Sequence, residues 1–128
     1  MNNFPDLNGL RILVVDDDAD NLELTAIILE TFSVQVIKAA SASEALKIVR
    51  QFEFDVLISD IAMPEEDGYS LIRQIRQVMQ IPAIALTALA MPEERSMALK
   101  SGFQLYLTKP VEPIDLVTEV AKLVGRSP

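Results

Sequence analysis

The chain has 128 residues and a net charge of −8 at pH 7, half of its residues are hydrophobic, and it contains neither cysteine nor histidine. This composition suits one domain and excludes disulfides, cysteine nucleophiles, and most catalytic triads and transition-metal sites. Any bound metal is expected to be a hard cation with oxygen ligands. The acidic charge argues against direct nucleic-acid binding, and no apolar run approaches the ~18 residues of a membrane span.

Strand and helix patterns alternate five times along the chain, between an expected polar leader (1–8) and a short tail (126–128). One domain is therefore expected over residues 9–125. Short apolar runs predict the strands, and apolar residues at helical spacing predict the helices. The strands are expected at 10–15, 34–38, 56–60, 83–87 and 103–109. The helices are expected at about 19–31, 41–51, 68–78, 92–101 and 113–124.

Strict alternation of strands and helices predicts a parallel sheet with right-handed crossovers and helices on both faces. Runs 10–15, 56–60 and 83–87 are almost entirely apolar, which is typical of central strands covered on both sides. Runs 34–38 and 103–109 contain polar residues, as edge strands do. This pattern favours an α/β, flavodoxin-like (βα)5 doubly wound sheet with strand order 2-1-3-4-5.

Polar residues stand at the carboxyl ends of the predicted strands. Asp16 and Asp17 follow the first strand, and Asp60 ends the third. Thr87 ends the fourth strand and Lys109 ends the fifth. The carboxyl ends of parallel strands lie along one edge of a sheet, where open α/β sheets bind their ligands. We therefore expect these five side chains to converge.

A cluster of three carboxylates requires compensating charge. Two carboxylates about 4 Å apart repel by roughly 4 kcal/mol at an effective dielectric constant near 20. Mg²⁺ suits such a cluster because it takes one or two carboxylates, water and a phosphoryl oxygen. A carboxylate can itself accept a phosphoryl group as a covalent nucleophile. Lys109 would then neutralise phosphoryl oxygens and the Thr87 hydroxyl would donate to one of them, while the small Ala88 leaves the site open.

Four short segments of the chain stand in a specific order and at specific spacings. The segments are Ile12-Leu13-Val14-Val15-Asp16-Asp17, then Asp60 with Met63-Pro64 and Asp67-Gly68, then Leu86-Thr87-Ala88, and Thr108-Lys109-Pro110. In these segments the chain resembles the CheY-like receiver domain of bacterial two-component response regulators, over about residues 9–125. Each segment alone is a weak signal, but together they are highly specific to this family.

The resemblance implies that Asp60 accepts a phosphoryl group from the phosphohistidine of a histidine kinase or phosphotransfer protein, and that the domain is not otherwise an enzyme. It implies that Mg²⁺, or Mn²⁺ in its place, is held by Asp16, Asp17, Asp60 and the backbone carbonyl of Ala62. The expected location is cytoplasmic, without insertion into a membrane.

The resemblance also implies a conformational switch. Thr87 and Tyr106 form the switch pair, with Tyr106 turning inward as Thr87 moves toward the phosphoryl group, and the Lys109–Pro110 peptide bond is expected to be cis. The helix at 92–101 has little apolar content, so we expect it to be loosely held. A downstream target would dock on the face made by the fourth helix, fifth strand and fifth helix.

Two positions depart from common family patterns. Ala62 lies two residues after Asp60, and Leu89 lies two residues after Thr87; both are apolar. Neither side chain can hold an attacking water, so a long-lived phosphorylated form is expected.

Some of the acidic residues have simpler structural roles. Asp18 is expected to cap the helix that follows it, and Asp67-Gly68 is expected to serve only as a turn. A calcium-binding loop starting at Asp16 is disfavoured because Asn21 occupies the required glycine position and Ile27 the terminal glutamate position.

Four alternative functions remain open at this stage. Val14-Val15-Asp16 and Asp18 mimic the start of a haloacid-dehalogenase-type phosphatase, although the pattern does not continue. A nucleotide- or flavin-binding module is disfavoured because glycine-rich phosphate loops are missing. A receiver degenerated into a pure interaction domain would not keep the complete acidic set. The chain would also fit a receiver module cut from a hybrid histidine kinase or multidomain regulator.

Overall fold

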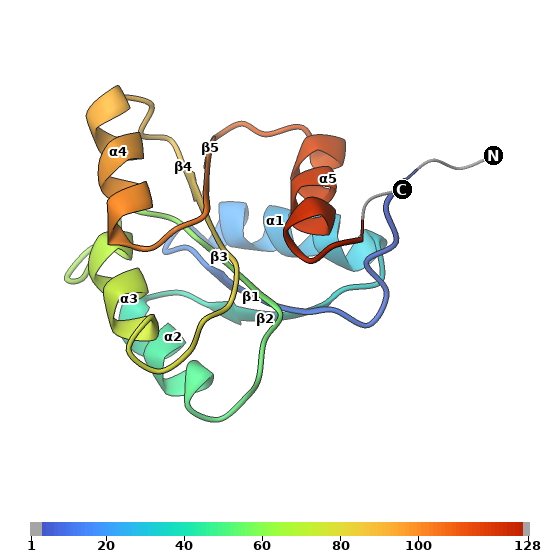
Figure 1. Cartoon of the computed structure of the whole chain (residues 1–128), viewed down its shortest axis with the longest axis horizontal. Coiled ribbons are helices and arrows are strands. Elements are labelled where there is room, and N and C mark those ends of the chain that lie inside the picture. Colours follow the sequence, from blue (N-terminus) through green and yellow to red (C-terminus); the bar gives the residue numbers. More distant parts are fainter. Residues whose placement is uncertain (1–3, 127–128) are drawn as a thin grey trace.

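The computed structural model describes residues 4–126 and contains one parallel five-stranded sheet in the order β2-β1-β3-β4-β5 (Figure 1). Fold class and strand order are therefore as predicted. Neighbouring strands are in parallel register, with Val15 opposite both Ala39 and Ser59. The strands are β1 (Arg11–Val15), β2 (Gln35–Ala39), β3 (Val56–Ser59), β4 (Ala83–Thr87) and β5 (Leu105–Thr108).

Helices cover both faces of the sheet. Helices α1 and α5 lie on one side, and α2, α3 and α4 lie on the other (Figure 1). Alternate strand residues feed two separate cores: Leu13 and Leu57 point toward α2 and α3, whereas Ile12 and Ile58 point toward α1 and α5. The helices are α1 (Ala19–Thr31), α2 (Ala42–Val49), α3 (Gly68–Ile75), α4 (Pro92–Ser101) and α5 (Pro113–Leu123).

Polar side chains cap the N-termini of three of the helices. Asp18 accepts hydrogen bonds from the backbone of α1, which confirms its expected capping role. Ser41 caps α2 and Asp67 caps α3 in the same way. These caps satisfy amide groups that have no partner within the first turn of a helix, and so fix where each helix begins.

The structure differs from the sequence prediction in two places. The third helix was expected to extend to Val78, but α3 ends at Ile75 and Val78 is 63% exposed. Residues 1–8 were expected to form a polar leader, yet Leu7 is fully buried in the core beneath α1 and α5. Arg126 donates to the carbonyl of Asn8 at 2.5 Å and so ties this segment to the far end of the chain. Residues 1–3 and 127–128 lie outside the described residues.

The turn after α1 forces Ser33 into a left-handed conformation, with φ of 67°. Ser33→Gly should raise the free energy of unfolding by about 0.5–1 kcal/mol, because the left-handed region costs a side chain ~1–2 kcal/mol and the added freedom of glycine returns only part of that. Urea denaturation measures the change. As a control, Ser96→Gly in the exposed middle of α4 should destabilise by about 0.5 kcal/mol. Destabilisation by both variants would contradict the argument.

Candidate functional site

Three carboxylates meet at the carboxyl edge of the sheet. Asp16 and Asp17 follow β1, Asp60 follows β3, and these strands are paired neighbours. One carboxylate oxygen from each of the three lies within 4.8 Å of the others. The predicted convergence of the acidic residues is therefore present, and it follows from the parallel register of β1 and β3.

The Lys109 ammonium joins two of these carboxylates. It donates to Asp16 at 2.7 Å and to Asp60 at 3.0 Å. Lys109 stands one residue beyond β5, so a residue of the edge strand reaches across β4 to residues that follow the central strands. Burial lowers the pKa of Lys109, but the hydrogen bonds to Asp16 and Asp60 outweigh it and raise the pKa overall. The amine is held in its charged form.

Asp16 is the most enclosed member of the cluster, with 4% of its surface exposed. Burial raises the pKa of Asp16, although the hydrogen bonds from Lys109 and from the Asp18 amide act in the opposite direction. Three carboxylates with one ammonium leave an excess of negative charge. An all-oxygen donor set with this excess fits Mg²⁺ or Mn²⁺. Ala62, whose carbonyl was expected to complete the set, lies in the β3–α3 loop.

The two oxygens of the Asp60 carboxylate have different partners. One accepts from the backbone amide of Ile61 at 2.6 Å, and the other accepts from Lys109 at 3.0 Å. Its side chain is 12% exposed, so one side remains open to an incoming group. A carboxylate held in one orientation and partly open is suited to nucleophilic attack.

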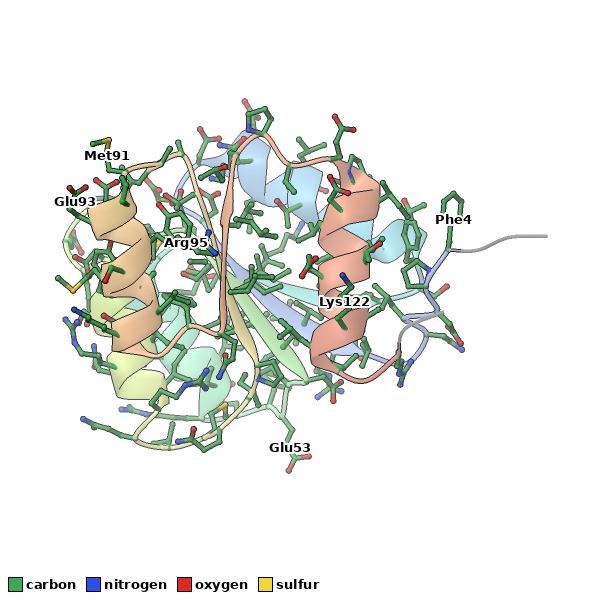
Figure 2. The ribbon with its side chains drawn as sticks, turned by 45° about the horizontal axis from the view of Figure 1, so that its top comes forward. Phe4, Glu53, Met91, Glu93, Arg95 and Lys122 are labelled. Carbon is green, nitrogen blue, oxygen red and sulfur yellow. The ribbon has the colours of Figure 1, made fainter. Side chains whose placement is uncertain are left out.

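Thr87 and Tyr106 are linked through the backbone of one residue, Leu89. Thr87 ends β4, is fully buried, and accepts from the Leu89 amide at 3.3 Å. Tyr106 of β5 donates its hydroxyl to the carbonyl of the same Leu89. Tyr106 was expected to turn inward, and here it is already buried, with 4% exposed. Arg95 projects from α4 toward β5 and lies 6.0 Å from the Tyr106 ring centre (Figure 2).

The expected cis peptide bond between Lys109 and Pro110 is present. It lies immediately after the residue that carries the ammonium group.

Helix α4 has the small apolar contact that was expected, since its buried residues are Ala98 and Ser101. What was not anticipated is a row of polar contacts from α3. Tyr69 donates to the Glu94 carbonyl at 3.2 Å, and Arg73 donates to the Ser101 hydroxyl at 3.3 Å. The helical spacing was the available signal, because it places Tyr69 and Arg73 on one face of α3 and Arg76, just past its end, in line with them.

Arg76 holds the carboxyl end of α4 more firmly than Tyr69 holds its start. Its guanidinium donates twice to the Gly102 carbonyl, at 3.1 and 2.8 Å, and once to the Gln104 side chain at 2.9 Å. Hydrogen bonds from a charged donor are about twice as strong as neutral ones. The attachment of α4 is therefore strong at one end and weak at the end nearest Thr87.

The sequence family model for the response regulator receiver domain matches residues 12–121 of this chain. The chain belongs to this family, and it is thus a signalling domain of the two-component type. The comparison does not support the phosphatase alternative.

Individual relatives agree. The chain is 48% identical to an uncharacterized 14.6 kDa protein of Leptolyngbya boryana, over 87% of each chain. It is 36% identical to the sensor histidine kinase RcsC of Escherichia coli over 92% of this chain but only 12% of that protein. The CheY-like receiver domain protein of Methanospirillum hungatei JF-1 has a TM-score of 0.86 and 32% identity, covering 91% of this chain and 94% of that one.

None of the helices within residues 4–126 has both the length and the apolar content needed to cross a bilayer.

Removing the shared ammonium group should destabilise the domain. Lys109→Met should lower the free energy of unfolding by about 2–3 kcal/mol, because it leaves the Asp16 and Asp60 carboxylates side by side without their cation. Urea denaturation with a chelator present measures the loss. In the matched control, Lys122→Met removes an exposed ion pair to Glu119 at 3.6 Å and should cost under about 0.5 kcal/mol. Equal losses of unfolding free energy in the two variants would show that the Lys109 contacts stabilise the domain no more than an exposed ion pair does.

Proposed function

We propose that Asp60 accepts a phosphoryl group from the phosphohistidine of a histidine kinase or phosphotransfer protein, in a reaction that needs a divalent cation. The observation that carries this proposal is the cluster of Asp16, Asp17 and Asp60 within 4.8 Å, joined by Lys109. Mg²⁺, or Mn²⁺ in its place, would be held by Asp16, Asp17, Asp60 and the Ala62 carbonyl. The metal would supply positive charge to the phosphoryl oxygens.

In this reaction a carboxylate oxygen of Asp60 forms a bond to phosphorus, and the bond from phosphorus to the donor's imidazole nitrogen breaks. The imidazole keeps the electron pair. The Ile61 amide, 2.6 Å from one Asp60 oxygen, holds the carboxylate in orientation. The Lys109 ammonium, which is already charged, would stabilise the negative charge on the phosphoryl oxygens. The domain is an acceptor that assists its own modification, not an enzyme acting on a separate substrate.

The signal would leave the site through Leu89. The Thr87 hydroxyl accepts from the Leu89 amide, and it would turn to donate to a phosphoryl oxygen. The Leu89 amide would then lose its partner, while the Leu89 carbonyl remains bonded to Tyr106. Because Leu89 lies two residues before Met91, the residue that immediately precedes α4, the shift would pass to the start of that helix. Phosphorylation would thereby bias an equilibrium between two arrangements of this region that both exist before phosphorylation.

The output face proposed for a downstream protein is formed by α4, β5 and α5. Met91, Met97 and Leu99 of the α4 region are 58%, 49% and 42% exposed, and Ile114 of α5 is 40% exposed. Met91 and Glu93 project outward at the start of α4 (Figure 2). Exposed methionine and leucine side chains favour adaptable protein contacts. We infer that the domain works in the cytoplasm, whether alone or within a larger kinase or regulator.

Phosphorylation by a small phosphodonor tests the proposed site. Incubated with acetyl phosphate and Mg²⁺, the chain should gain one phosphoryl adduct, measured by intact mass. The adduct should vanish in Asp60→Asn and without the metal. Asp17→Asn should raise the Mg²⁺ concentration for half-maximal rate by about tenfold or more, because one ligand loses its charge.

The matched control for charge is Asp20→Asn, which removes an exposed carboxylate from the first turn of α1 and should leave the metal requirement within about twofold. An adduct that persists in Asp60→Asn, or that forms equally well with a chelator present, would refute the assignment of Asp60.

Binding of beryllofluoride, a phosphoryl analogue, tests the output route. With Mg²⁺, it should shift amide NMR signals of residues 88–96 several-fold more than those of residues 99–104. The reason is that Arg76 fixes the carboxyl end of α4, whereas the neutral Tyr69 contact at 3.2 Å is weaker. Uniform shifts along α4 would contradict the unequal attachment, and unchanged shifts throughout α4, β5 and α5 would contradict the output face.

A further inference from the structure

The backbone carbonyl of Asp60 lies outside the strand ladder. Pairing of β3 with β4 ends at Ser59, and although the Asp60 amide still donates to Val15, no backbone amide within residues 4–126 donates to the Asp60 carbonyl. A carbonyl enclosed without a partner would be costly. Its partner is the Ser59 hydroxyl, which donates to it at 2.8 Å.

Ser59 is an unusual residue for its position. It follows Val56-Leu57-Ile58 in a strand whose four residues are all buried, and it is itself 0% exposed. Burying a hydroxyl is unfavourable unless it forms a hydrogen bond. An apolar side chain there would extend the core, so the hydroxyl is best explained by the hydrogen bond to Asp60.

The opposite side of the same carbonyl is closed by Gly68. A Cβ atom at Gly68 would lie 2.3 Å from the Asp60 carbonyl oxygen and 2.9 Å from the Ile61 Cα, so no side chain can be accommodated. The Gly68 amide also donates to the Ile61 carbonyl at 2.8 Å. Gly68 was expected to serve only as a turn residue, but its missing side chain lets α3 begin directly against Asp60.

We propose that Ser59 and Gly68 are positioning residues that fix the Asp60 peptide between β3 and α3 and thereby aim its carboxylate. This inference rests on the proposed role of Asp60 as phosphoryl acceptor. The Ile61 amide that holds one carboxylate oxygen belongs to the same peptide unit as the Asp60 carbonyl. Rotation of that peptide would move the amide and the carboxylate together. Misplacement of a nucleophile by fractions of an ångström slows attack.

The test compares Ser59→Ala with Ser101→Ala. Both serines are buried, at 0% and 9% exposed, and both hydroxyls form one side-chain hydrogen bond, but Ser101 bonds to Arg73 away from Asp60. With acetyl phosphate and saturating Mg²⁺, Ser59→Ala should acquire the phosphoryl adduct about 5- to 10-fold more slowly, as expected for loss of one buried hydrogen bond. Ser101→Ala should stay within about twofold of the unsubstituted chain.

Two further readouts separate positioning from general loss of stability. Ser59→Thr keeps the hydroxyl and should recover the rate to within about twofold. The Ile61 amide proton resonance should move upfield in Ser59→Ala and stay in place in Ser101→Ala, because its hydrogen bond to Asp60 lengthens only in the former.

Normal phosphorylation of Ser59→Ala, or equal slowing in Ser101→Ala, would overturn the positioning role. Absence of an adduct on the unsubstituted chain would instead overturn the proposed function of Asp60, and this inference with it.

Discussion

Lys109 donates from one ammonium group to Asp16 at 2.7 Å and to Asp60 at 3.0 Å, and the rest of the site is arranged around that double contact. The two carboxylates follow neighbouring strands, so the parallel register of β1 and β3 brings them together. Their mutual repulsion in a partly buried place would oppose folding without a nearby cation. The same excess of acidic oxygens makes the site suitable for a divalent ion.

The two ends of α4 are attached to the rest of the domain with unequal strength. The weak end of the helix lies near Leu89, whose amide donates to the Thr87 hydroxyl and whose carbonyl accepts from the Tyr106 hydroxyl. The strong end is fixed by Arg76, whose guanidinium donates twice to the Gly102 carbonyl. In the switch that we propose, a change at Thr87 would move the first turns of this helix while its last turn stays in place. The small apolar contact of α4 is consistent with such a motion.

Much of this arrangement could be predicted from the sequence because it depends on periodicity and topology. Apolar runs predicted the strands, polar edge residues predicted their order, and parallel strands carried Asp16, Asp60 and Lys109 to one edge. The sequence did not predict features that depend on a single side-chain conformation or on close packing. The contact from Arg76 to α4 depends on how two helices pack. Leu7 is an apolar residue in a segment that is otherwise mostly polar, and its burial depends on packing against side chains of α1 and α5.

Ser59 shows why such features escape sequence patterns and still matter for function. A serine at the end of an apolar strand resembles an ordinary strand terminus, and only the orientation of the Asp60 carbonyl reveals what its hydroxyl does. Pairing of β3 with β4 ends at Ser59, one residue before Asp60. Ending a strand leaves a backbone acceptor to be satisfied. The Ser59 hydroxyl satisfies that acceptor, and the missing side chain at Gly68 leaves the Asp60 carbonyl the room it occupies.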